Sequence, residues 1–97
     1  MQRYYGNWST LTEMCDDFQI DEASLTDCDI LFARYDTPEY EGYAFVVFRK
    51  DNVLYEVHGS HCSCNGLEGL WEAEATTIEA LRMRDDAEML TAVEAPA

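Results

Sequence analysis

The chain has 97 residues and a formal net charge of -14, because 20 Asp and Glu residues stand against 6 Lys and Arg. This balance excludes direct binding to nucleic acid and electrostatic docking on an anionic membrane, since both interactions need clustered Lys and Arg. A hydrophobic content of 47% excludes an unfolded acidic tail and is typical of one small folded domain, which we expect to span residues 1–97.

The first expected element is a helix over residues 10–18. Thr10 followed three residues later by Glu13 matches a capping box, which marks a helix start. Residues 19–27 then read as an acidic connection with room for a short helical turn. The apolar residues that recur at helical spacing and form one stripe are Leu11, Met14, Cys15 and Phe18.

Three strands follow, over residues 28–35, 43–49 and 53–58. Residues 50–52 between the last two are short enough for a tight hairpin turn. The middle strand is apolar on both faces, and such a strand is usually covered twice. We expect a helix on one of its faces, and the C-terminal helix or a partner subunit on the other.

Residues 70–72 are expected to add a short strand or an extended segment. A second capping box, Thr76 with Glu79, starts a helix over about residues 77–90. The polar tail, residues 85–97, is expected to be partly frayed. The predicted fold class is α+β: an N-terminal helix, a three- to four-stranded antiparallel sheet (meander) and a C-terminal helix.

The compartment is predicted from the absence of targeting segments. Residues 1–8 lack the apolar run of a signal peptide, and no stretch approaches the ~18 apolar residues of a membrane span. We therefore expect a cytoplasmic protein with reduced thiols.

The densest cluster of reactive side chains follows the third strand. Zinc takes imidazole and thiolate ligands, but structural sites usually draw spaced ligand pairs from two separate segments. Here Cys62 and Cys64 are separated by one residue, and no second CxxC or HxxxH appears. Zinc is one interpretation of the cluster, and no other cofactor is expected. The candidate metal ligands are His58, His61, Cys62 and Cys64.

Two further interpretations of this cluster need no metal. Cys62 or Cys64 as a nucleophile with a neighbouring histidine as base would make a thiol enzyme, but the many carboxylates raise the pKa of a thiol. Alternatively the segment is a tightly turned loop, in which Cys is a small buried hydrophobe and His a hydrogen-bonding plug. We expect this structural role and no enzymatic activity.

The same segment carries a family resemblance. Residues 59–69 read GSHCSCNGLEG, and Trp71-Glu72, Thr76-Thr77 and the segment 79–81 (EAL) follow. This pattern, of the type GSHCSCxGLEGxWE, resembles small uncharacterised proteins of bacteriophages and prophages. The resemblance covers roughly a quarter of the chain and implies a phage origin, without implying an activity or any functional residue.

The acidity, together with a phage origin, predicts a mimic of DNA. Duplex DNA carries one charge per about 1.7 Å of axis, so fourteen charges match roughly 24 Å of duplex. Half of the acids lie between residues 13 and 41, where Arg34 is the only Lys or Arg. The predicted partner-binding acidic face consists of Glu13, Asp16, Asp17, Asp21, Glu22, Asp27, Asp29, Asp36, Glu39 and Glu41.

The predicted partner is a DNA-binding protein of the bacterial host, in whose cytoplasm the protein would act. Candidates are DNA gyrase, a nuclease or CRISPR effector, RNA polymerase and nucleoid proteins. DNA gyrase is the most specific choice, because its DNA gate offers a long basic saddle to a two-fold acidic homodimer.

Two alternatives need no DNA mimicry. One is a small zinc-binding domain that uses the His/Cys cluster. The other is a dimeric structural or regulatory protein whose sheet face pairs with itself. The residues whose exposure in a monomer would support that dimer are Tyr43, Phe45, Val47, Tyr55 and Val57.

Overall fold

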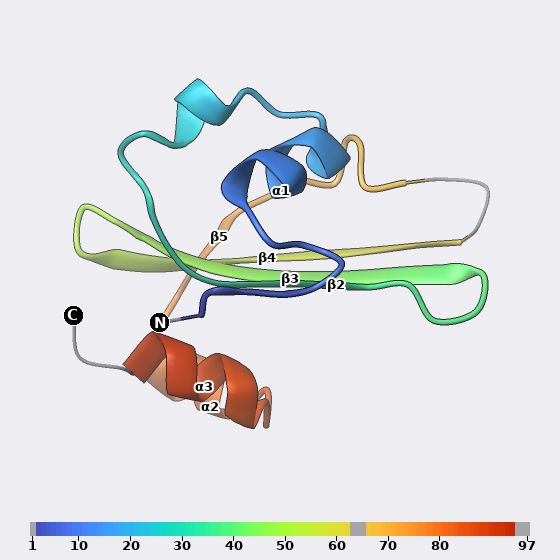
Figure 1. The fold of residues 1–97 in the computed structure, drawn as a ribbon. Coiled ribbons are helices and arrows are strands. Elements are labelled where there is room, and N and C mark those ends of the chain that lie inside the picture. Colours follow the sequence, from blue (N-terminus) through green and yellow to red (C-terminus); the bar gives the residue numbers. More distant parts are fainter. Residues whose placement is uncertain (1, 63–65, 95–97) are drawn as a thin grey trace.

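The computed structural model describes residues 2–62 and 66–94. Within them a five-stranded sheet with the order β1-β2-β3-β4-β5 forms the middle layer. Helix α1 and the 3-10 helix η1 lie on one side of the sheet, and helices α2 and α3 lie on the other (Figure 1). The elements are β1 (Tyr4–Gly6), α1 (Leu11–Phe18), η1 (Glu22–Leu25), β2 (Asp29–Asp36), β3 (Glu41–Lys50), β4 (Val53–Cys62), β5 (Glu74–Thr76), α2 (Ile78–Arg82) and α3 (Ala87–Glu94).

The α+β class is confirmed, but the arrangement differs from the predicted meander. The three predicted strands correspond to β2, β3 and β4, which pair antiparallel in chain order. Strand β1 adds a parallel pair to β2, so the sheet is mixed. Strand β5 occupies Glu74–Thr76, a few residues after the expected 70–72. Both extra strands have three residues, too few for a sequence period to reveal.

Helix α1 begins and packs as its sequence predicts. Thr10 is the N-cap, and the reciprocal hydrogen bonds of the capping box with Glu13 are both present. The helix ends at Gln19, whose left-handed φ of 58° provides the C-cap. The side chains that α1 buries against the sheet are Met14, Cys15 and Phe18.

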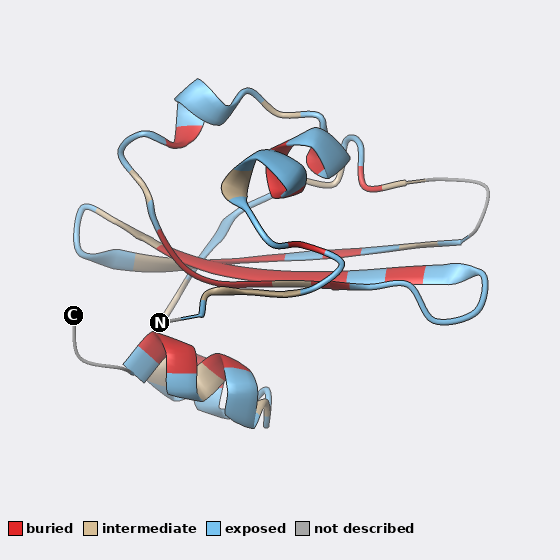
Figure 2. Ribbon diagram, viewed as in Figure 1, coloured by how far each residue is buried: buried red, intermediate tan, exposed pale blue. Residues whose placement is uncertain are grey.

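Strand β3 is covered on both faces, as its apolar sequence predicts. Ala44, Val46 and Phe48 pack in a core under α1, while Phe45 and Val47 pack in a second core under α3. Buried residues therefore run along the middle of the sheet on both sides (Figure 2). The turn to β4 has positive φ at Asp51 and Asn52, as a type I′ hairpin requires.

The second cover of β3 comes from α3, the C-terminal helix, which was one of the two covers expected. Phe45, Val47 and Val57 are all buried in the single chain, at 9%, 0% and 0% exposure. Phe45 and Val47 lie under α3 and Val57 lies under α1, whereas Tyr43 is 49% exposed, so these residues do not form one exposed sheet face. The homodimer stays a prediction.

The C-terminal segment differs from the prediction in three ways. The expected helix over 77–90 is two helices, α2 and α3, because the chain turns between them at Asp85, whose φ is 53°. The N-cap of α2 is Thr77 instead of Thr76, and its hydroxyl accepts from the Ala80 amide. Residues 87–94 of the expected frayed tail form α3, because Met89 and Val93 are buried on the sheet; residues 95–97 lie outside the described residues.

None of the helices in residues 2–62 and 66–94 is long and apolar enough to cross a membrane.

Candidate functional site

Residues 10–27 carry six carboxylates and contain no Lys or Arg, although Lys50 of β3 lies beside Ser24 and Leu25 of η1. All six are exposed on α1, η1 and the turn before β2, and we call this the α1–η1 surface. They are Glu13, Asp16, Asp17, Asp21, Glu22 and Asp27.

Uncharged donors hold several of these carboxylates in place. Asp17 accepts a hydrogen bond from the indole Nε1 of Trp8 at 2.7 Å. Glu13 accepts from the Ser9 amide at 2.7 Å, and Glu22 accepts from the hydroxyl of Thr12 at 3.1 Å. Such bonds fix the position of a carboxylate without cancelling its charge.

The carboxylates of this surface affect the pKa of a buried thiol, that of Cys15. Cys15 lies on the buried side of α1 and is 2% exposed. Burial raises the pKa of the Cys15 thiol, and so do, in decreasing order, the carboxylates of Glu22, Asp16 and Asp21.

The other four predicted acids lie elsewhere, so the ten do not form one strip. Asp29 starts β2 and pairs with Arg3 at 2.7 Å. Asp36 is the last residue of β2. At ~3.3 Å per residue it lies about 23 Å from Asp29, and Glu39 and Glu41 follow it in the chain. All four are exposed. The α1–η1 surface therefore holds six of the ten, and three others gather at the β2–β3 turn.

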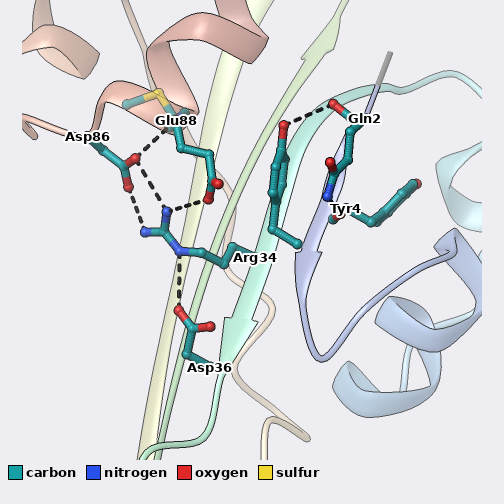
Figure 3. A network of polar contacts seen from close by, with 8 residues as sticks. Gln2, Tyr4, Arg34, Asp36, Asp86 and Glu88 are labelled. Carbon is teal, nitrogen blue, oxygen red and sulfur yellow. Dashed lines mark hydrogen bonds and ion pairs between the residues drawn. The ribbon is translucent and has the colours of Figure 1, made fainter.

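Arg34 and Arg82 bind carboxylates of the α2–α3 layer. Arg34 on β2 contacts Asp86 at 2.6 Å, Glu88 at 3.2 Å and Asp36 at 3.3 Å, which joins α3 to the sheet (Figure 3). Asp86 also accepts from the Met89 amide and so caps α3. Arg82 of α2 pairs with Glu94 of α3 at 2.6 Å.

Strand β4 separates the two predicted histidine ligands. His58 stacks on Phe45, 4.5 Å between ring centroids, on the α3 side. His61 contacts the Tyr35 hydroxyl at 2.6 Å on the α1 side. Residues three apart on a strand point to opposite faces, so these imidazoles do not meet at one ion. Residues 2–62 and 66–94 bring no three metal-ligating side chains together; Cys62 is exposed, and Cys64 lies outside the described residues.

His61 makes a hydrogen bond as the expected plug would, but residues 58–62 belong to strand β4 instead of a tightly turned loop, and Cys62 is exposed. Its partner across the β3–β4 pair is Gly42, and a Cβ there would collide with the imidazole ring. The glycine thus leaves the space in which His61 reaches Tyr35.

A buried ionised carboxylate, missed at the sequence level, organises His58. Glu56 is 3% exposed and accepts two hydrogen bonds of 3.0 Å from Arg84. Burial alone would raise the pKa of Glu56, but hydrogen bonds from Arg84, His58 and Thr76 lower it to about 2. Because this carboxylate only accepts, the His58 Nε2 at 2.5 Å donates to it.

A pocket of about 380 Å³ opens beside His58. Cross-strand pairs place two rows of side chains along its wall, on the α3 side of the sheet. One row runs Arg34, Phe45, His58, and the other runs Asp36, Tyr43, Ser60. The sequence signal that could have revealed the wall is the alternation of Glu56, His58 and Ser60 on β4, which puts all three on one face.

Comparisons with protein-family models, curated proteins and solved structures found no match. The resemblance to phage and prophage proteins therefore stays a prediction.

Proposed function

We propose that this protein is a phage-encoded inhibitor that occupies the basic DNA-binding groove of a host protein in the bacterial cytoplasm. The observation that supports it is the α1–η1 surface, with six exposed carboxylates on a segment that contains no Lys or Arg. Helix α1 is about 12 Å long and carries three of the six, about half the charge of duplex DNA over the same length of axis. The other three carboxylates, on η1 and the turn before β2, add to this negative charge.

The rigidity of the surface also supports a role in binding. Three of its carboxylates stand on α1, which is packed on the sheet, and uncharged donors fix several of the six. A groove that binds phosphates would meet charges already in place, with little side-chain ordering on association. The principal dimensions of 37 × 30 × 24 Å suit a groove that accepts a duplex.

The first experiment is capture of a partner from bacterial lysate at low and high salt. We expect a DNA-binding protein at low salt, its loss at about 0.5 M salt, and its displacement by added duplex DNA. Recovery of no DNA-binding protein at low salt, or a complex that DNA does not displace, would contradict the proposal. DNA gyrase is the specific partner to test first, by inhibition of its supercoiling activity and by direct binding.

A matched pair of double variants tests the surface itself. Asp16→Asn with Asp27→Asn removes two charges from the α1–η1 surface and should weaken partner binding about tenfold. Asp51→Asn with Glu79→Gln removes two exposed charges elsewhere and should change it less than about twofold. Equal losses in both variants would mean that net charge, and not this surface, determines binding.

A homodimer that lengthens the acidic surface belongs to the same proposal. Sedimentation of the isolated protein measures it, and a monomer at all concentrations would restrict the proposal to one six-carboxylate surface per target.

A further inference from the structure

The pocket beside His58 lies away from the α1–η1 surface and has its own chemistry. Its lining combines flat rings with hydrogen-bond acceptors. Phe45 and His58 stack with an interplanar angle of 16°, and the Tyr43 ring is 49% exposed. Ser60 adds a hydroxyl, and Asp36 adds a carboxylate. A flat ligand that donates hydrogen bonds fits such walls best.

The charge around the pocket is negative although an arginine lines it. Arg34 contributes one positive charge, and its three ion-pair partners contribute three negative charges, which leaves a net -2. A neighbouring hollow of about 280 Å³ shares Tyr43 and Ser60 with the pocket and adds Glu41. Glu41 accepts the hydroxyl hydrogen of Tyr43 at 2.6 Å. An anionic ligand is disfavoured here, whereas a cation is attracted.

The guanidinium group combines the required properties. It is planar, carries a positive charge, presents five N–H donors, and stacks on aromatic faces. The compact ammonium of lysine provides the charge but no flat face. Asp36, whose side chain is 52% exposed, is the pocket carboxylate open to such a ligand.

We propose that this pocket binds the guanidinium of an arginine side chain on the partner protein. This inference rests on the proposed function, because grooves that bind DNA phosphates are rich in arginine. The α1–η1 surface then supplies long-range attraction, and the pocket supplies a point of recognition for one arginine.

The test uses small probes that lack charged backbone groups: N-acetyl-arginine amide, N-acetyl-lysine amide and inorganic phosphate. Each is titrated at low ionic strength into the full chain while backbone amide shifts are recorded by NMR. The arginine probe should shift the amides of Phe45, His58 and Ser60, and bind several-fold more tightly than the lysine probe. Phosphate should not shift these amides. Equal binding of both cations, preferential binding of phosphate, or shifts only on the α1–η1 surface would overturn the proposal.

Two substitutions locate the site. Asp36→Asn should weaken the arginine probe about five- to tenfold, as expected for loss of a charge-assisted hydrogen bond. Asp51→Asn removes the same charge from the far end of β3, where Asn suits the φ of 52°, and should change binding less than about twofold. Tyr43→Leu keeps apolar bulk but removes the ring face, and should abolish the preference for arginine over lysine. Unchanged arginine binding in both Asp36→Asn and Tyr43→Leu would overturn the proposal.

The two proposals fail separately. A salt-sensitive complex with a DNA-binding protein that survives Asp36→Asn and Tyr43→Leu unchanged would overturn the pocket as an arginine site and leave the inhibitor proposal standing. Binding of the arginine probe without any DNA-competed partner would overturn the inhibitor proposal and retain the pocket.

Discussion

The two helical layers carry similar numbers of carboxylates but use them differently. On the α1–η1 side six carboxylates stand without an arginine, and several accept bonds from uncharged donors. On the α2–α3 side Asp86 and Glu88 bind Arg34, and Glu94 binds Arg82. Charges neutralised within the fold attach a layer to the sheet. Charges left unpaired cost stability through repulsion and are available to a partner.

The largest effect should come from the packing that both layers share. Met14 of α1 and Met89 of α3 are each 0% exposed, one in each core. Replacement of either by Ala should lower the free energy of unfolding by about 2–5 kcal/mol, because each leaves a cavity. Urea denaturation measures both variants under the same conditions.

A loss of stability below about 1 kcal/mol for Met89→Ala alone would contradict the expectation that apolar packing holds both layers to the sheet. It would mean that α3 is held to the sheet mainly by Arg34 and not by its apolar face.

The next largest effect should be a loss of stability at low pH that is caused by protonation of Glu56. A carboxylate with a pKa of about 2 in the folded state and about 4.5 when unfolded stabilises the fold above pH 5. That contribution, of the order of 3 kcal/mol, should be lost as the pH falls from about 5 towards 2. Glu56→Gln should therefore reduce stability at pH 7 and flatten its acid dependence.

The measurement compares unfolding at pH 7, 5 and 3 in Glu56→Gln and in the control Glu94→Gln, whose side chain is 39% exposed. Protonation also relieves the repulsion among the other carboxylates, which acts in the opposite direction in every variant. The difference between the two variants isolates Glu56. Identical acid profiles would contradict its role.

The sequence predicted features that depend on near neighbours in the chain. Four such features depend on residues only a few positions apart. They are the capping box of α1, its buried stripe, the 50–52 hairpin and the two-sided burial of β3. The separation of helices α2 and α3 at Asp85 was missed, because the apolar residues on both sides of the turn continue a helical pattern.

The candidate site needed contacts between distant segments. Glu56 reads as one acid among 20, and only the fold brings Arg84, 28 residues away, onto it. His58 and His61 read as a cluster, although strand alternation alone could have separated them once β4 was extended to Cys62. The acidic surface could be predicted only in part. The absence of Lys and Arg over residues 4–33 is visible in the sequence, whereas the separation of the ten predicted acids into groups depends on the fold.

A moderate effect should follow from weakening the Arg34 contacts. The Asp86 side chain is 16% exposed; burial raises its pKa, but the hydrogen bonds from Arg34 and the Met89 amide prevail and lower it. Asp86→Asn should therefore cost about 1–2 kcal/mol of stability, because it weakens both the Arg34 bond and the cap of α3. Hydrogen exchange should show faster opening of α3, with α1 unaffected. Equal acceleration in both helices would contradict a local effect.

The smallest effect should have the opposite sign, and it sharpens the contrast between the layers. Asp16→Asn with Asp27→Asn removes two exposed charges from a segment that contains no basic residue, so it should raise Tm by about 1–3 °C at low salt. The gain should vanish at about 0.5 M salt, because screening already removes the repulsion. A lower Tm at every salt concentration would mean that these carboxylates stabilise the fold as Asp86 does. A rise that salt abolishes would mean that this layer gives up stability to keep its charge, as a surface that binds a basic partner requires.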